Sequence, residues 1–395
     1  MRHLLSRSRR HAARGMTLIE TMVALVIGMV LTLAVFSVMA TFEGRRRTLT
    51  STSDLEQAGT LAMFQLERWV RTAGSGFVQS AEYAYGCALN AAKSSAQILP
   101  ASTLSAPFAG VNPGTSGVFR LAPVMILPGQ TTPGASGSGS DVLVLMSSGA
   151  SSGETATLFN GAAAAAQLTL VNSVAFTAND LVLLADQQPA AAGGIAPCLL
   201  TQAGSTAIAG TETTMALSGT WYAPTVNSVS PTSFSDTAAA LTLGNPGLNR
   251  PPAFQLVGVG DNNTLYTYDL LKTSATPLQA RGEGVFELHA LYGVDSDGDG
   301  FVDSWVSPSS GSYTVAALSA GTEAAATLLR TIKAVRVGLI LRTSLPEKVV
   351  AQSGTLKLFS DLGSTLEFSR TLTTAEQKYR YRTMEATIPV RNNLL

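Results

Sequence analysis

The chain has 395 residues, in which 26 Lys and Arg balance 26 Asp and Glu, and only 13% of the residues are charged. This length suffices for one large domain or two ordinary ones, and the balanced charge argues against a nucleic-acid-binding protein. The main body has a single histidine, His289, which excludes a multi-histidine zinc site and leaves a Ser-His-Asp hydrolase one candidate base.

The neutral total hides an uneven distribution of charge. The first 15 residues contain five Arg and no acidic residue, so residues 16–395 carry 21 positive and 26 negative charges. Residues 121–249 contain no Lys or Arg and six acidic residues. The sequence therefore predicts a basic leader followed by an acidic protein.

Behind the leader lies an apolar segment, residues 21–42, without a charged side chain. As a helix it would span roughly 33 Å at about 1.5 Å per residue, which is enough for the core of a bilayer. It is too long for the apolar part of an ordinary secretory signal, and no small-residue cleavage site follows it before Arg45. We therefore expect a retained membrane anchor.

The residues before this segment resemble a known signal. Gly15 to Glu20 read Gly-Met-Thr-Leu-Ile-Glu, which is similar to the type III signal of type IV pilins and pseudopilins. The resemblance implies that a prepilin peptidase removes residues 1–15 by cutting between Gly15 and Met16, and then methylates the amine of Met16. Met16 differs from the Phe that is commoner at this position.

Glu20 places a carboxylate in an otherwise apolar stretch, which costs roughly 2.5–3.5 kcal/mol on insertion scales. The resemblance implies compensation, because this residue pairs with an N-terminal ammonium when pilin subunits pack. The alternative is a glutamate near the membrane surface that favours the positive end of its own helix. Five leader Arg against the three of residues 45–47 favour a cytoplasmic N-terminus and a head in the periplasm.

The helix is expected to continue through residues 16–73. Its second half has an apolar stripe with spacings of three and four, formed by Leu55, Ala58, Ala62, Leu66, Trp69 and Ala73. This stripe predicts packing on a globular domain, and Gly74 and Gly76 then end the helix. A coiled coil is the alternative, although the stripe is shorter than three heptads.

The rest of the chain, residues 77–395, has the pattern of a β-rich head. Strands are predicted at residues 141–146, 180–185, 285–292, 335–342 and 379–388. His289 and Glu287 fall on the face opposite to the apolar residues, so we expect a solvated position for His289. Residues 129–245 are rich in Gly, Ala and Ser, and stretches such as 129–140, 161–166 and 189–194 predict loops of a low-complexity insertion.

Scattered motifs of the head resemble the PilW-type minor pilins. They include Arg-Thr-Ala-Gly at residues 71–74, Tyr-Gly-Cys at 85–87 and Tyr-Arg-Tyr-Arg at 379–382. The resemblance implies an α+β, type IV pilin-like fold with a long N-terminal helix on a β-rich head. It implies a minor pilin in a tip or priming complex. We do not expect an enzyme, because the head has one solitary His and no convergent catalytic motif. Its expected partners are the inner membrane, prepilin peptidase, the major pilin, other minor pilins and a tip adhesin, and its destination is an extracellular pilus.

Two other functions are compatible with the sequence. PilW-type pilins resemble the large minor pseudopilin of type II secretion systems, so a pseudopilin is the main alternative. The acidic segment without Lys or Arg is also compatible with an adhesive or partner-docking surface at the tip.

A run of acidic residues, Asp-Ser-Asp-Gly-Asp-Gly-Phe-Val-Asp at residues 295–303, has the spacing of a calcium loop. Its expected ligands are Asp295, Asp297, Asp299, the backbone carbonyl of Phe301, and Asp303. Val306 replaces the bidentate Glu of an EF-hand, so another group would have to complete the shell. The alternative is an Asp- and Gly-rich turn without metal.

Two cysteines, Cys87 and Cys198, are both expected on the oxidising side of the membrane, which predicts one disulfide. Closing a loop of about 110 residues restrains the unfolded chain by roughly 4–5 kcal/mol in the chain-entropy model. The alternative is two separate buried thiols.

Overall fold

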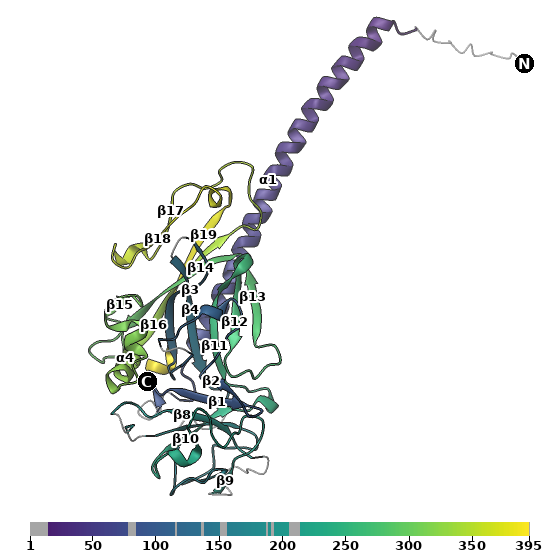
Figure 1. The fold of residues 1–395 in the computed structure, drawn as a ribbon. Helices are drawn as coiled ribbons and strands as arrows, with labels where there is room; N and C mark the ends of the chain where they lie inside the picture. Colours follow the sequence, from purple (N-terminus) through teal and green to yellow (C-terminus); the bar gives the residue numbers. More distant parts are fainter. Residues whose placement is uncertain are drawn as a thin grey trace, which may run out of the picture. The chain divides into compact units, whose positions relative to one another are not determined.

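The computed structural model describes residues 15–77, 84–114, 117–135, 138–150, 156–186, 189–190, 193–204 and 214–394. The chain forms two compact units, Met1–Asp54 and Leu55–Leu395. The described part of the first unit is helical from Leu18 onward, and the described strands lie in the second unit (Figure 1).

Helix α1 runs without interruption from Leu18 to Thr72, as the sequence predicted. It ends where Gly74 and Gly76 adopt positive φ angles of 85° and 81°, a conformation that few other residues adopt. The N–H of Gly74 donates to the carbonyl of Met146 at 2.8 Å, so the turn that ends the helix is tied to a strand of the head.

The part of α1 in the second unit buries one stripe. Its buried residues are Leu55, Ala62, Leu66, Val70 and Ala73. Gly59 lies at a close approach, because a Cβ there would be 2.1 Å from Cδ1 of Leu341 and 2.7 Å from Sδ of Met384. The stripe therefore packs on strands, and not on a second helix in the described chain.

Three larger sheets build the second unit. The first has the order β2-β1-β8-β7-β10-β5, with β1 at Leu89–Lys93, β2 at Ala96–Leu99, β5 at Thr157–Leu158, β7 at Leu181–Ala185, β8 at Cys198–Gln202 and β10 at Ala239–Gly244. The second has the order β13-β12-β11-β4-β3, with β3 at Val124–Ala135, β4 at Ser138–Ser147, β11 at Ala253–Gly260, β12 at Thr264–Asp269 and β13 at Leu278–Glu283.

The third sheet has the order β15-β14-β16-β19, with β14 at Val285–Val294, β15 at Ser304–Val306, β16 at Ile332–Arg342 and β19 at Tyr381–Pro389. Two small sheets pair β17 (Thr355–Leu358) with β18 (Phe368–Thr371), and β6 (Gln167–Thr169) with β9 (Thr214–Ala216). Short helices α3 (Val315–Leu318) and α4 (Glu323–Thr331) precede β16.

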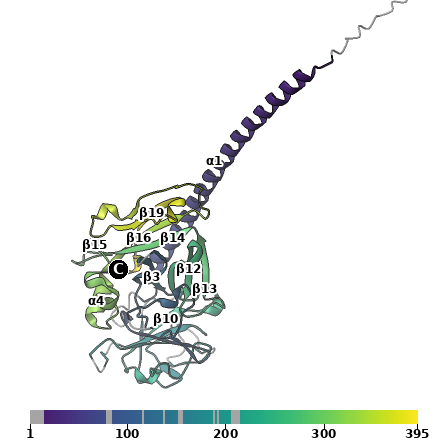
Figure 2. The same ribbon diagram turned by 45° about the horizontal axis from the view of Figure 1, so that its top comes forward.

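The four-stranded sheet is covered on both faces (Figures 1 and 2). On one face Val337 and Leu339 join the main core, together with Leu66 and Val70 of α1. On the other face Ile340 packs in a separate cluster that includes Leu358 and Phe359, in and beside the β17–β18 hairpin. Side chains on both faces of this sheet are therefore withdrawn from water.

The stretch predicted as loop at residues 129–140 is instead largely strand. It forms the end of β3 and the start of β4, with Thr131 opposite Ser140, apart from residues 136 and 137, which lie outside the described chain. Strands β5 to β10 likewise fall within residues 129–245, and several of their side chains are buried. Backbone pairing and β-branched or Leu residues in short runs outweigh the Gly- and Ala-rich composition here.

These elements confirm an α+β fold with a pilin-like N-terminal helix and a β-rich head. The strands predicted near residues 141, 180, 285, 335 and 379 correspond to β4, β7, β14, β16 and β19.

Candidate functional site

The N-terminal signal residues lie at the start of α1. Gly15, Met16 and Thr17 precede the helix, and the N–H of Glu20 donates to the carbonyl of Thr17 at 3.0 Å and to its Oγ1 at 3.4 Å. Thr and Glu three residues apart at a helix start are the pattern of a capping box. Thr17 therefore caps the helix whose third residue is Glu20.

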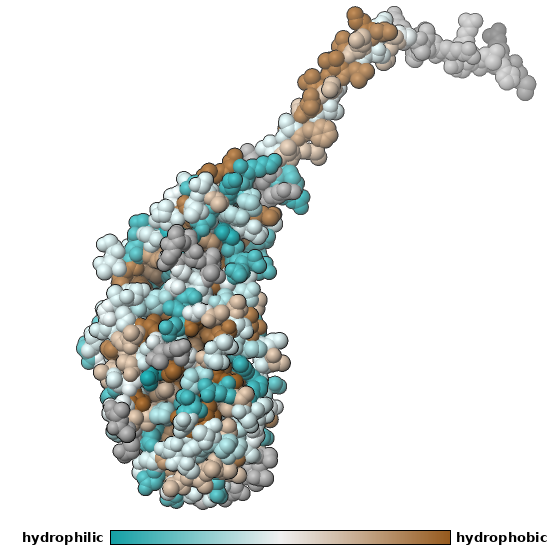
Figure 3. Space-filling view, in the orientation of Figure 1, coloured by the Kyte–Doolittle hydropathy of each residue, from teal (hydrophilic) through white to brown (hydrophobic). Residues whose placement is uncertain are grey.

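The first part of α1 is the apolar span. Helix residues Leu18–Glu43 contain an 18-residue window with a mean hydropathy of 2.6, and none of that window is buried in the described chain. Its apolar side chains are exposed, as the hydropathy colouring shows (Figure 3). By length and composition this helix can cross a membrane.

The acidic run forms the loop between β14 and β15. Val294 pairs with Ser304, so residues 295–303 make a connection between two antiparallel strands, as the sequence predicted, and not part of a helical EF-hand. Asp295 is 2% exposed, and its carboxylate accepts hydrogen bonds from the N–H groups of Gly298 at 2.6 Å and Gly300 at 2.9 Å. Asp295 therefore fixes the fold of the loop.

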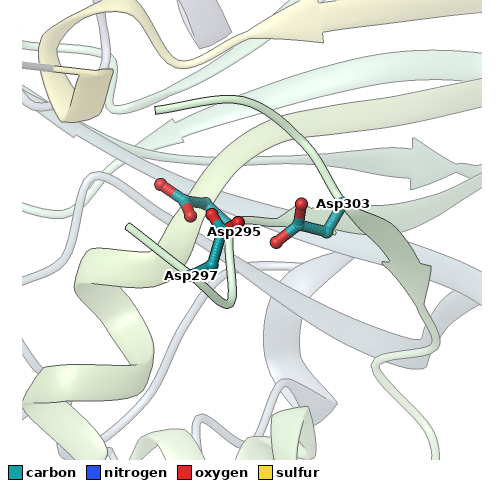
Figure 4. A group of neighbouring side chains, drawn as sticks. All are labelled: Asp295, Asp297 and Asp303. Carbon is teal, nitrogen blue, oxygen red and sulfur yellow. The ribbon is translucent and has the colours of Figure 1, made fainter. Parts of the chain in front are cut away.

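Three of the expected ligands converge. One carboxylate oxygen from each of Asp295, Asp297 and Asp303 lies within 4.8 Å of the others, and Figure 4 shows the carboxylate of Asp303 pointing toward the other two. Asp299 is not in this group, and its Oδ1 accepts from the N–H of Phe301 at 2.8 Å. The arrangement fits a hard cation with three carboxylate ligands, one fewer than the sequence suggested.

The same carboxylates have other partners. Oδ2 of Asp303 accepts from the N–H and the hydroxyl of Ser296 at 2.7 and 2.6 Å, and these hydrogen bonds lower the pKa of Asp303. Nζ of Lys333 lies 3.9 Å from Oδ2 of Asp295. The carbonyl of Phe301 stays a predicted ligand, and the Phe301 side chain is exposed.

A disulfide joins Cys87 and Cys198, with 5.6 Å between their Cα atoms, which confirms the predicted bridge. Cys198 starts β8 and pairs in parallel with Leu89 of β1. The N–H of Cys198 donates to the carbonyl of Ala88 at 2.9 Å. The bridge therefore fastens the first residue of β8 to the segment just before β1, which lies 111 residues earlier in the sequence.

The prediction of a solvated His289 is wrong. His289 is 6% exposed and Glu287 is fully buried, because the β17–β18 hairpin covers this face of β14. The ring of His289 stacks on Phe368 of β18, with 3.6 Å between ring centroids. Alternation in the sequence placed Glu287 and His289 on one face of the strand but did not predict the hairpin above that face. It also placed Phe286 on the opposite face, whereas a register shift between Val285 and Glu287 brings Phe286 into the hairpin-side cluster.

His289 belongs to a buried charge network that the sequence analysis missed. Its Nε2 lies 3.3 Å from Oε2 of Glu287, and its Nδ1 lies 3.6 Å from Oδ1 of Asp141 in β4. Arg370 of β18 places its Nε 2.9 Å from Oε1 of Glu287 and its guanidinium 2.6 Å from Glu376. The network links three sheets through buried ion pairs.

Asp141 also serves the backbone. Its carboxylate accepts from the N–H of Gly129 at 3.0 Å and from that of Ala290 at 2.9 Å. Burial by itself would lower the pKa of His289, but hydrogen bonds and charge interactions with Asp141 and Glu287 outweigh it and raise the pKa to about 9. His289 is therefore a cation near neutral pH.

Three of the four acidic side chains that the structure describes in the segment without Lys or Arg form hydrogen bonds within the head. Asp141 and Asp180 are buried, and Asp180 accepts from Nδ2 of Asn245 at 2.9 Å. Asp186 accepts from the N–H and the hydroxyl of Ser235, both at 2.7 Å. Most acidic side chains described in this segment hold the fold together; its Glu154 and Glu212 lie outside the described residues.

Comparison with protein families gives two matches. Residues 10–36 match the prokaryotic N-terminal methylation motif, and residues 257–392, about a third of the chain, match type IV pilus-assembly protein W. The two matches support a PilW-type pilin with a prepilin-type signal. No curated protein and no solved structure matches the chain.

The two matched regions contain most of the features described above. The methylation motif covers Gly15, Met16 and Glu20, and together with the apolar helix it indicates membrane anchoring. The PilW region covers β14, the aspartate loop, β16 and β19. The model that matches this region describes a pilus-assembly protein.

Proposed function

We propose that this PilW-type pilin is a minor pilin that takes part in type IV pilus assembly, in a priming complex with other minor pilins at the filament tip. The observation that carries the proposal is the presence of a methylation motif, an apolar helix and a PilW region on one chain. Each has a separate task, namely processing, anchoring and subunit recognition.

The proposed pathway begins in the inner membrane. Prepilin peptidase cuts between Gly15 and Met16 and methylates the new amine, while residues 21–42 hold the chain in the bilayer. The head folds in the periplasm, where the Cys87–Cys198 disulfide can form, and later leaves the cell with the pilus. The disulfide supports this compartment because such bonds persist in oxidising surroundings.

Glu20 supplies register during assembly. An unpaired carboxylate in an apolar segment costs roughly 2.5–3.5 kcal/mol, so pairing with the ammonium of Met16 on a neighbouring subunit favours the packed filament over the free anchor. The exposed apolar side chains of Leu18–Glu43 would then pack against helices of the neighbours.

The size of the head supports a place at the tip. The second unit, Leu55–Leu395, holds three larger sheets, and such a bulky head is difficult to repeat along a thin fibre. Neighbouring minor pilins and a tip adhesin would be its contacts there.

A strain that lacks this chain tests the proposal. Electron microscopy should show far fewer pili than in the parent, secretion of type II substrates should be unchanged, and the intact chain supplied in trans should restore the pili. Normal pili together with lost secretion would contradict the proposal and would assign the chain to a pseudopilus.

We further propose that the loop at residues 295–303 binds calcium through Asp295, Asp297 and Asp303. The observation in favour is the convergence of their carboxylates, two of them exposed, on one point of a strand connection. Extracellular calcium can fill even a weak site of this kind, which would neutralise the repulsion between the three carboxylates.

A further inference from the structure

Strand β19 forms a free edge of the four-stranded sheet. It pairs only with β16, in an unbroken antiparallel register from Ala334 opposite Pro389 to Arg342 opposite Tyr381. No described strand pairs with its other edge. Its nine residues make it a long and regular edge.

The register decides which backbone groups face outward. Val390 donates its N–H to Lys333 at one end, and Arg380 accepts from Thr343 at the other, so even-numbered residues of β19 exchange hydrogen bonds with β16. The odd-numbered residues point away, and the N–H of Tyr381 accordingly donates to Oε1 of Gln352 at 3.0 Å.

Three outward amides remain, those of Thr383, Glu385 and Thr387. The structure records no hydrogen bond from these N–H groups to any residue that it describes. A row of such groups is a template for another strand.

Other edge strands in the described chain have features that hinder pairing with a further strand. Strand β3 contains Pro128 and Pro133 and two register shifts, and β13 has a register shift and carries Arg281 stacked over Trp69. Strands β2, β5 and β15 have four, two and three residues. Prolines, bulges, charges and short strands usually protect an edge against pairing. Strand β19 is long and has no register shift, and its proline is its last residue. Its charged side chains are already paired within the subunit.

Those charges are neutralised within the subunit. The guanidinium of Arg382 lies 2.5 Å from Glu56 of α1, and the carboxylate of Glu385 lies 2.9 Å from Arg336 of β16. An added strand therefore meets Thr side chains and paired charges, and does not need a charge of its own.

A second copy of this chain does not fit the edge. Glu56 contacts Arg382, and the carbonyls of Thr72 and Ala73 accept from Asn392, so α1 and β19 run in the same direction. Antiparallel pairing of two β19 strands would make the two α1 helices run in opposite directions, which two anchors in one membrane do not allow. Parallel pairing would bring Glu385 against Glu385 of the other copy, and like charges opposite each other are destabilising.

We propose that the outer edge of β19 binds an extended segment of a different protein by β-strand addition. The segment alternates apolar and uncharged polar residues. Its apolar side chains face α1, where Met384 and Met63 are only partly buried in the core. Met63 lies seven residues from Glu56, and so on the flank of α1 that borders this edge.

Residue-resolved hydrogen exchange of the full chain tests the proposal. It is measured on the chain purified in detergent and on the same chain in the cell envelope of its native host. In the purified chain the amides of Thr383, Glu385 and Thr387 should exchange fast, whereas those of Met384 and Ala386 should be slow. In the envelope the exchange rates of the three outward amides should be at least about tenfold lower than in the purified chain.

Paired variants sharpen the test, with the Glu385 amide as the reporter. The Thr383→Pro/Thr387→Pro chain loses two outward donors but keeps its ladder with β16, and Thr383→Ala/Thr387→Ala keeps both donors. Protection of Glu385 in the envelope should persist in the Ala variant and vanish in the Pro variant. If slow exchange at Met384 and Ala386 is lost, the Pro variant is misfolded. The test then rests on whether Glu385 is protected in the envelope in the native and Ala chains.

Fast exchange of the outward amides in both preparations would overturn the proposal. Protection already present in the purified chain, together with a dimeric mass, would overturn it in favour of a second copy. These outcomes do not depend on the proposed role in pilus assembly, because the envelope contains every membrane-bound or filament-bound partner and the deletion strain judges that role separately.

Discussion

Glu20 has a local place in its helix and, in our proposal, a second role in subunit packing. Its N–H is capped by Thr17 within the same helix, and a Glu at this position also suits the positive end of α1. Both effects are local and would operate in an isolated subunit. The proposed pairing with a neighbouring Met16 amine requires the charge and a second subunit.

Glu20→Gln separates these effects, because Gln can occupy a capping box but carries no charge. We expect Glu20→Gln and Glu20→Ala to reduce pilus number alike, by about tenfold if the pairing contributes about 1.4 kcal/mol, while both chains stay in the membrane fraction. Pilus counts and membrane immunoblots measure the two quantities. Normal piliation with Glu20→Gln would show that the helix cap alone matters.

His289 should make the free energy of unfolding of the head depend on pH. Its pKa is about 9 in the folded chain, above the ordinary 6.5, so the protonated form is stabilised by folding. This stabilisation is complete below about pH 6.5 and disappears as the pH rises through 9. The free energy of unfolding should fall by at most about 3 kcal/mol over that interval, as urea titrations of the full chain in detergent can show.

The matched control is His289→Gln, which fills a similar space without titrating. Its free energy of unfolding should be lower than that of the native chain at pH 6, and the two should converge above pH 9. A parallel pH dependence in both proteins would contradict a protonated His289 between Asp141 and Glu287.

At the scale of elements, the aspartate loop contains carboxylates that converge on one point and one carboxylate that does not. Asp297→Asn removes a converging carboxylate, whereas Asp299→Asn removes one that lies outside the group. We expect calcium to raise the thermal midpoint of the native and Asp299→Asn chains, and to raise that of Asp297→Asn less. Equal calcium shifts in both variants, or no shift up to millimolar calcium in the native chain, would refute the assignment of ligands.

Elements with a strong periodic pattern could be predicted from the sequence. The stripe from Leu55 to Ala73 predicted the packed half of α1, and alternating apolar residues predicted β14. The β3–β4 hairpin could not be predicted, because the Gly and Ser residues near Ser138 pair through their backbone and leave no pattern of side chains.

Of the candidate functional sites, those formed by local motifs could be predicted from the sequence. Local motifs gave the signal at Gly15 and the loop at Asp295, which need no distant residue to be recognised. The network around His289 depends on Asp141 and Arg370, which tertiary folding brings from distant strands, and Glu287 on the same face as His289 was its only local sign.

At the scale of the whole head, the disulfide fastens β8 to the start of β1. Cys87→Ser/Cys198→Ser should lower the free energy of unfolding by up to roughly 4–5 kcal/mol, because the unfolded chain regains the freedom of a long loop. Denaturant titrations of the double variant and of the native chain measure the difference. An unchanged free energy of unfolding would contradict this prediction. It would mean that removing the bridge stabilises the folded state as much as it stabilises the unfolded state.

At the scale of the whole molecule, the central proposal is that the chain is processed as a prepilin and enters the pilus. Mass spectrometry of sheared, purified pili tests this most directly. It should find this chain at low abundance, with an N-terminal peptide that begins at N-methylated Met16 and with no peptide from residues 1–15. Pili that lack the chain, or a chain in pili that still carries the leader, would contradict it.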